Sequence, residues 1–254
     1  MNPGRGIAAS CIPRTLPISY RRFHGIRIQV HVPIVGTRAG ARIHRRTRAP
    51  VDWAFDISGN WSLPTNWSPV VLPDSNSDVS IVSVTGLKTV THDTGNDTIH
   101  SLTTNGSAIV TVTGGSSLQV DNGGMNGNTF RADNGPFAFN SGVLNNSGTL
   151  NAINNGTVQF MNGAVLRGGA TSTASGGQVL LASGAVLDGT TSGAVTNTGV
   201  INFAGGNTIY VAGAIANSGT ITVGANADLR MQGSSAVTVS GNGTVTPTDG
   251  NSRT

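Results

Sequence analysis

The chain has 254 residues, of which 37% are hydrophobic and only 10% are charged, and its formal net charge at pH 7 is +4. Its one cysteine, Cys11, excludes an internal disulfide framework, and no apolar run of about 18 residues is present that could cross a bilayer as a helix. So few charged side chains leave little for acid–base catalysis, and the composition favours a non-enzymatic protein without a cofactor.

Residues 1–50 differ sharply from the rest of the chain. They hold ten arginines and no acidic residue, whereas residues 51–254 hold five basic and eleven acidic side chains (5 − 11 = −6). Such a segment is typical of a nucleic-acid-binding arm or a targeting peptide. Arg21 and Arg22 are similar to an export signal, but polar residues interrupt the following stretch, Ile26–Val32. We interpret residues 1–50 as a disordered tail or a misassigned translation start, with no recognisable signal peptide and no nucleic-acid partner.

The three tryptophans of the chain, Trp53, Trp61 and Trp67, fall within fifteen residues. The motif around them reads W…GNWS.P.NWS, followed by P…D.V.I up to Ile81. It resembles the opening segment that precedes β-solenoid repeats in many secreted bacterial proteins, among them autotransporter passengers and filamentous-haemagglutinin-like adhesins. The resemblance covers about residues 52–248 and implies export to the cell surface or exterior.

The tryptophans have two interpretations. The first coil of a solenoid exposes apolar core and unpaired strand edges, which large aromatic side chains can cover. Alternatively, exposed faces of Trp61 and Trp67 could stack on sugar rings while asparagines hydrogen-bond the hydroxyls. We favour a cap over residues 51–78 and keep sugar binding by Trp61 and Trp67 as the alternative.

Asp74, Asn76 and Asp78 place oxygen ligands at alternate positions, as the start of a calcium loop does. The glycine and the distal glutamate of such a loop are missing, so these residues are a calcium candidate only by their spacing, and we expect no metal. A second polar group lies within residues 92–100, where two histidines and two aspartates are close in sequence. Its spacing matches no common zinc pattern, so we interpret this stretch as a solvated loop.

Aliphatic residues in the second half of the chain recur in three rows. Within a row the spacing is 20 to 24 residues, and successive rows are 6 to 8 residues apart. The rows are Val158, Leu180, Ile201, Ile221 and Val245; Leu166, Leu187, Ile209 and Leu229; and Ala174, Val195, Ile215 and Val237. Such a period is typical of repeat proteins in which each unit buries its apolar face only against its neighbours.

Alternation within the rows identifies the repeating elements as strands. Thr208–Val211 and Thr220–Val223 place apolar residues at every second position. Between rows lie Gly, Asn and Ser, which tolerate the left-handed backbone of a sharp corner. Asn162–Gly168 matches Ser183–Gly189 at five of seven positions, one coil apart. We therefore predict an all-β fold, a right-handed parallel β-helix (β-solenoid) with three short strands per coil of about 20–22 residues.

The predicted solenoid extends over residues 79–248. The pattern is looser upstream of the three rows, but roughly eight coils fit, each rising about 4.8 Å. The least regular stretch, residues 121–135, is rich in Gly and Asn and is predicted to be an oversized corner loop. Residues 249–254 are predicted to be a disordered end.

The register also predicts which ionisable side chains point outward and stack on one another. The residues one step after the second row form the column Arg167, Asp188, Tyr210 and Arg230. Polysaccharide-cleaving β-helix enzymes build sites from such columns, but this one has a single carboxylate, and only Asp228 could supply a second. We favour an ordinary ion pair between Arg167 and Asp188 in adjacent coils.

Outward threonine ranks are a further candidate surface, because paired Thr-x-Thr rows on a flat sheet are the pattern expected for ice binding. Thr220 and Thr222 align with Thr244 and Thr246, but the two preceding coils lack threonines at these positions. We therefore do not favour ice binding.

These patterns together predict a non-enzymatic structural or adhesive module. It would be extracellular or at the bacterial cell surface, as a passenger-like fragment of an autotransporter or related adhesin. Its expected partners are a host surface, extracellular matrix or polysaccharide. The alternative is a carbohydrate-binding or polysaccharide-cleaving parallel β-helix.

Overall fold

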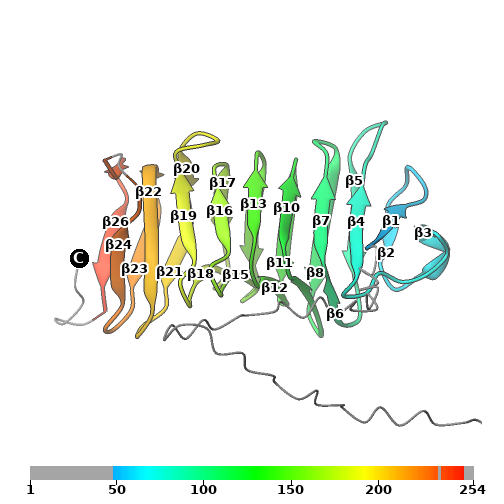
Figure 1. Cartoon of the computed structure of the whole chain (residues 1–254), viewed down its shortest axis with the longest axis horizontal. Coiled ribbons are helices and arrows are strands. Elements are labelled where there is room, and N and C mark those ends of the chain that lie inside the picture. The colour runs from blue at the N-terminus through cyan, green and yellow to red at the C-terminus, as the bar shows by residue number, and fades with distance from the viewer. Residues whose placement is uncertain (1–47, 234–235, 249–254) are drawn as a thin grey trace, which may run out of the picture. The chain divides into compact units, whose positions relative to one another are not determined.

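The computed structural model describes residues 48–233 and 236–248. The predicted tail therefore lies outside the described residues except for its last three positions, and the predicted end at 249–254 lies outside them entirely. The described residues form strands, one short 3-10 helix (η1, Pro64–Asn66) and no α-helix. No helix among them is long and apolar enough to cross a membrane. Figure 1 shows the strands stacked in successive coils.

Each coil contributes one strand to each of three parallel sheets, which we call the first, second and third faces. The first face contains β1 (Ala49–Trp53), β4 (Ser77–Ile81), β7 (Ser101–Thr104), β10 (Gly123–Asn126), β13 (Val143–Asn146), β16 (Val165–Arg167), β19 (Val186–Gly189), the first half of β22 (Thr208–Asn217) and β24 (Asp228–Met231). The second face contains β2 (Gly59–Asn60), β5 (Lys88–His92), β8 (Ala108–Thr113), β11 (Thr129–Asp133), β14 (Thr149–Ile153), β17 (Ala170–Thr173), β20 (Val195–Asn197), the second half of β22 and β25 (Thr238–Ser240). The third face contains β6 (Gly95–Ile99), β9 (Ser116–Val120), β12 (Pro136–Phe139), β15 (Thr157–Phe160), β18 (Gln178–Leu181), β21 (Val200–Phe203), β23 (Thr220–Val223) and β26 (Thr244–Pro247).

About eight coils run from β4 to β26, which confirms the predicted parallel β-solenoid with three strands per coil. Residues that face each other in neighbouring coils are 19 to 26 positions apart, from Leu118 and Phe137 at the short end to Thr171 and Asn197 at the long end. The cap segment also contributes strands, since β1 pairs in parallel with β4, and β2 with β5. The short strand β3 (Trp67–Ser68) instead runs antiparallel to β1 and closes the beginning of the stack.

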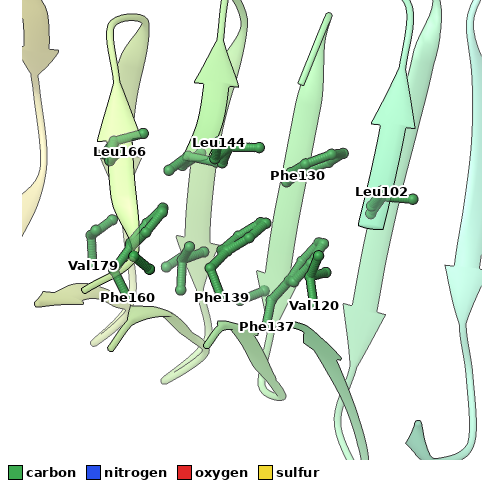
Figure 2. Packing of buried hydrophobic residues seen from close by; sticks show 14 of the residues in the cluster. Leu102, Val120, Phe130, Phe137, Phe139, Leu144, Phe160, Leu166 and Val179 are labelled. Atoms are coloured by element: carbon green, nitrogen blue, oxygen red, sulfur yellow. The ribbon is translucent and has the colours of Figure 1, made fainter. Parts of the chain in front are cut away.

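Inward side chains fill the space between the three faces (Figure 2). Aliphatic residues stack on aliphatic residues from coil to coil, and four phenylalanines form a stack in the middle coils. The rings of Phe139 and Phe160 lie 5.0 Å apart at 14°, and those of Phe137 and Phe139 lie 5.3 Å apart at 17°. All four are at most 1% exposed, so this stack excludes water from the centre of the solenoid.

The predicted rows are partly out of register. Val179, not Leu180, faces Ile201, because both apolar neighbours in β18 satisfy the spacing. Leu187 faces Val211 rather than Ile209, since residues 190–194 lengthen the corner between β19 and β20.

The third predicted row is also corrected. Ala174 is exposed beyond the end of β17, while Val239, not Val237, faces Ile215. Corner length varies between coils, so sequence spacing alone places some members one or two residues away from their true position.

The prediction of an oversized corner loop over residues 121–135 is wrong. This stretch forms β10 and β11, an ordinary part of one coil. Gly124 has φ of +147°, and a Cβ there would lie 1.9 Å from the carbonyl oxygen of Leu102. Glycine is therefore needed for close approach of two strands, not for a loop.

Buried asparagines stack in pairs at two corners of the solenoid: one pair lies between the first and second faces, at the ends of β10 and β13, and the other between the second and third faces, at the ends of β20 and β22. The members are Asn126, Asn146, Asn197 and Asn217, each at most 2% exposed. Asn126 donates through its amide to Asn146 Oδ1 at 2.8 Å, and Asn197 donates to Asn217 Oδ1 at 2.8 Å. In the coil between these pairs, the Thr171 hydroxyl donates to Asn197 Oδ1 at 2.9 Å. These side chains also bind corner carbonyls, so they satisfy backbone groups that a sharp turn leaves unpaired.

Candidate functional site

Arg167 and Asp188 face each other on the outer side of the first face, on β16 and β19. Arg167 Nε donates to Asp188 Oδ2 at 2.9 Å, and Asp188 Oδ1 also accepts from the Thr190 backbone N–H at 2.9 Å. The Asp188 side chain is 10% exposed and the Arg167 side chain 28%. The predicted ion pair between adjacent coils is thus present, and the Thr190 contacts enclose it.

Tyr210 and Arg230 do not continue this column. Tyr210 faces Val186 on one side and Arg230 on the other, whereas Asp188 faces Ala212. The predicted column is therefore two separate pairs, Arg167 with Asp188 and Tyr210 with Arg230, which are offset from each other by two residues along the strands. Arg230 Nη2 lies 2.7 Å from Asp228 Oδ2, so the second available carboxylate is paired within its own strand.

The protonation of these groups follows from their partners. Burial of Asp188 raises its pKa, but the Thr190 hydrogen bonds and the Arg167 guanidinium outweigh that effect and hold the pKa below its usual value. The hydrogen bond and charge of Asp228 raise the pKa of Arg230. A general acid in glycoside hydrolysis needs a raised carboxyl pKa, so Asp188 is shifted in the wrong direction for that role.

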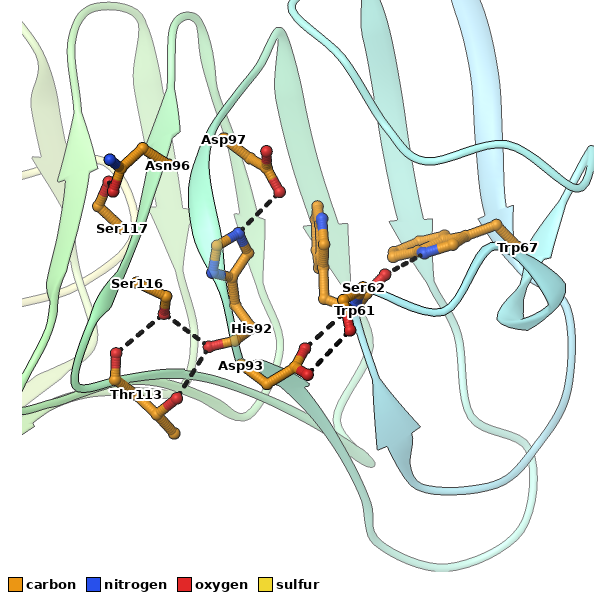
Figure 3. Close-up of polar contacts among 10 residues, drawn as sticks. All are labelled: Trp61, Ser62, Trp67, His92, Asp93, Asn96, Asp97, Thr113, Ser116 and Ser117. Carbon is orange, nitrogen blue, oxygen red and sulfur yellow. Dashed lines mark hydrogen bonds and ion pairs between the residues drawn. The ribbon is translucent and has the colours of Figure 1, made fainter.

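The tryptophans form a buried cluster that closes the beginning of the stack (Figure 3). Trp61 and Trp67 are 0% exposed, their ring centroids lie 4.6 Å apart, and Trp67 Nε1 donates to the Trp61 carbonyl at 2.8 Å. Trp53 packs edge-on against Trp67 at 4.8 Å. The alternative of sugar stacking by Trp61 and Trp67 is wrong, because a ring without exposed surface cannot contact a sugar. Their packing is that of a cap.

His92 lies directly under this cap, which corrects the prediction of a solvated loop over residues 92–100. The side chain is 0% exposed, its ring lies 5.4 Å from that of Trp61, and Nε2 is 3.0 Å from Asp97 Oδ2. Its Nδ1 and the Trp61 Nε1 are buried with no hydrogen-bond partner among the described residues. Asp93 accepts two hydrogen bonds from Ser62 and so ties the cap to the first complete coil. The alternation of Val90 and His92 within a strand is the signal that the spacing argument missed.

The three residues with calcium-like spacing are engaged in other contacts. Asp74 Oδ1 accepts from the Asn76 N–H at 2.9 Å in a local turn. Asp78 Oδ1 binds His100 Nδ1 and the Ser101 hydroxyl, each at 2.6 Å. Across residues 48–233 and 236–248, no cluster of three or more His, Cys, Asp or Glu side chains is placed to hold a metal.

The third face has a property that the three predicted rows do not indicate: no outward position within its strands holds a charged side chain. Asp121, directly after β9, is the carboxylate that borders the face, and it accepts a hydrogen bond from Gln119 at 2.7 Å. Two columns run along the third face, with the strands in register over every coil. The columns are Asn96, Ser117, Pro136, Thr157, Gln178, Val200, Thr220 and Thr244; and Thr98, Gln119, Ala138, Gln159, Leu180, Asn202, Thr222 and Thr246. Val200 and Asn202 interrupt the threonine rank, as the sequence indicates. The result is a long, neutral surface on which twelve of the sixteen outward residues carry a hydroxyl or an amide, and Pro136, Ala138, Leu180 and Val200 are apolar.

These features define the class as a parallel β-solenoid with a tryptophan cap, buried asparagine pairs at its corners and paired surface charges. Comparisons with protein-family models, curated proteins and solved structures find no match to this chain.

Proposed function

We propose that this chain is a non-enzymatic adhesive module of a secreted or cell-surface protein, of the kind that bacterial autotransporter passengers and filamentous-haemagglutinin-like adhesins contain. The neutral third face carries the proposal. Most of its outward positions offer hydroxyl or amide groups at the regular spacing of stacked strands, about 4.8 Å, and none of these positions carries a charge that binding would desolvate. A neutral polysaccharide lying across these coils is the ligand that suits such a surface.

The polysaccharide-cleaving alternative has less support. Asp188 and Asp228 are each bound to an arginine, and the pKa of Asp188 is lowered. Retaining and inverting glycosidases both require one carboxylic acid that keeps its proton near neutral pH. The contacts on the first face stabilise the ionised carboxylate instead.

Binding to immobilised neutral polysaccharides, such as cellulose, starch and a mixed-linkage β-glucan, tests the ligand class. Leu180→Arg places a long charged side chain between Gln159 and Asn202 on the third face, so we expect binding to weaken by at least about tenfold. Ile153→Arg is the matched control, since Ile153 is an equally half-buried outward aliphatic residue on the second face. Circular dichroism verifies that both variants fold.

Three outcomes contradict the proposal. If none of the neutral polysaccharides binds, the ligand class is wrong. An equal loss of polysaccharide binding in both variants would show that the third face is not the binding surface. Formation of new reducing ends during incubation would overturn the non-enzymatic assignment.

A further inference from the structure

A hydrogen-bonded polar cluster lies at one edge of the third face, where β9, β12 and β15 end. Asp121 directly follows β9, and its Oδ1 accepts from Gln119 Nε2 at 2.7 Å and from Asn140 Nδ2 at 3.2 Å. Asn140 directly follows β12, and its Oδ1 accepts from Asn162 Nδ2 at 2.6 Å. We call Gln119, Asp121, Asn140 and Asn162 the edge cluster. Its hydrogen bonds connect three successive coils, so the side chains hold one another in place.

The edge cluster retains hydrogen-bond acceptors that the protein does not use. Asp121 Oδ2 and Gln119 Oε1 accept no hydrogen bond from any of the described residues. A carboxylate can only accept, so a ligand that satisfies Asp121 must donate. The donors of a neutral carbohydrate are its hydroxyl groups, and their hydrogen bonds to a charged acceptor are stronger than those to a neutral one.

Small apolar side chains lie beside the edge cluster. Pro136 and Ala138 are outward residues of β12, and Ala138 faces Gln119 on one side and Gln159 on the other. Because alanine is much shorter than glutamine, the two glutamines stand above Ala138 on either side. The side chain of Gln159 has no hydrogen-bond partner among the described residues. A sugar ring can therefore rest its C–H groups on Ala138 while its hydroxyls reach the edge cluster and Gln159.

The position of the edge cluster suits a polymer that crosses the coils. The strand β12 is the third of the eight strands of the third face. The outward column that contains Ala138 continues to Thr98 on one side and to Thr246 on the other. A polymer that follows this column passes over Ala138 beside Asp121.

We propose that the edge cluster is the subsite that selects the ligand of the third face. Asp121 Oδ2 accepts hydrogen bonds from the hydroxyls of a neutral sugar, and its charge repels a sugar that carries a carboxylate. This inference rests on the proposed function, since it specifies which polysaccharides the third face binds. Like charges in close contact weaken binding, so one side chain supplies both the attraction to the correct ligand and the repulsion of the wrong one.

Binding of the full chain to matched pairs of polysaccharides tests this subsite. Cellulose, starch and mixed-linkage β-glucan are each compared with the same polymer after oxidation of its C6 hydroxymethyl groups to carboxylates. We expect the wild type to bind the neutral form at least about tenfold more tightly than the oxidised form. Asp121→Asn keeps Oδ1 as the acceptor for Gln119 and Asn140 and replaces Oδ2 with an N–H donor. We expect this variant to lose at least about tenfold of the preference, by weaker binding of the neutral form and tighter binding of the oxidised form.

Asp133→Asn is the matched control, because it removes the same charge from a different face. Asp133 is a half-buried outward residue of β11 on the second face, and its Oδ1 also accepts from an asparagine amide, Asn154 Nδ2, at 2.8 Å. We expect its preference to match that of the wild type. Circular dichroism verifies that both variants fold.

The outcomes separate this inference from the proposed function. A wild type that binds both forms equally, or a preference that Asp121→Asn leaves unchanged or that both variants reduce equally, overturns the subsite. If Leu180→Arg still weakens binding of the neutral form in that case, the third face remains the binding surface and the subsite alone is wrong. A wild type that binds none of the neutral polysaccharides overturns the proposed function and the subsite together.

Discussion

Burial of His92 beneath Trp61 makes the stability of the fold depend on the protonation of this imidazole. Desolvation lowers the pKa of the imidazole, and this effect outweighs the hydrogen bond to Asp97 and the charges of Asp97 and Asp93. The unfolded chain, with a histidine pKa near 6.5, therefore binds more protons than the folded chain below that pH. The contribution of His92 to stability is complete above pH 6.5 and is lost as the pH falls toward the folded-state pKa.

We predict that the free energy of unfolding decreases from pH 7 toward pH 5 and that His92→Leu reduces this slope, because leucine does not titrate. Urea denaturation at several pH values measures the effect. His100→Gln is the control, since His100 binds Asp78 away from the tryptophan cluster. A slope that is the same in His92→Leu as in the wild type would contradict the assignment.

The buried asparagines at the corners lead to a second prediction at the residue scale. Asn197 makes five hydrogen bonds, three as donor and two as acceptor, and is 0% exposed. Asn197→Ala leaves corner groups unpaired, so we expect a loss of about 1–3 kcal/mol in the free energy of unfolding. Asn202→Ala removes an outward amide on the third face and should cost less than about 0.5 kcal/mol. Equal midpoints of urea unfolding for the two variants would exclude a structural role for Asn197.

The tryptophan cap acts as an element that protects one end of the stack. Trp67→Ala removes two ring contacts and the hydrogen bond to the Trp61 carbonyl, and core substitutions of this size cost about 3–5 kcal/mol. Coils contact only their neighbours, so the loss should be local. We predict faster amide exchange in β1, β4 and β5, with β21 and β23 unchanged, measured by hydrogen–deuterium exchange.

Phe160→Ala provides the comparison for this experiment, because it removes another fully buried aromatic ring, in the middle of the stack. Its effect should centre on β12, β15 and β18. If Trp67→Ala accelerates exchange uniformly along the solenoid, the coils unfold as one unit and the cap has no local function.

The sequence predicts strands better than it predicts corners. Leu166 and Leu187 were placed correctly because the surrounding motif repeats without insertion. The next member of the same row is wrong: the pattern predicts Ile209 opposite Leu187, whereas Val211 lies there. Ile209 and Val211 are both inward apolar residues, and nothing in the pattern marks the longer corner before them. Glycines that allow two strands to approach closely cannot be told from glycines of a loop, because the composition of the sequence is the same in both settings.

The candidate sites divide in the same way. The Arg167–Asp188 pair follows from alternation and a local repeat, so it could be predicted. The burial of His92 depends on the cap folding over it from thirty residues upstream, which spacing alone does not indicate. The neutral third face becomes visible only when the register of all eight coils is known.

At the scale of the whole solenoid, stability is close to a sum of coil contributions and neighbour interfaces. The described ends are unequal, since one is closed by aromatic side chains and the other exposes a core and three edges.

The corners between the first and second faces have a consequence for how such a protein can diversify. Residues 82–87 separate β4 from β5 and residues 190–194 separate β19 from β20, whereas β22 passes the same corner through Gly213 with no loop. The strands on either side stack in register in all three cases. Loop length is therefore independent of the ladder, and evolution can lengthen, shorten or replace a projecting segment at this edge while the scaffold beneath it is inherited unchanged.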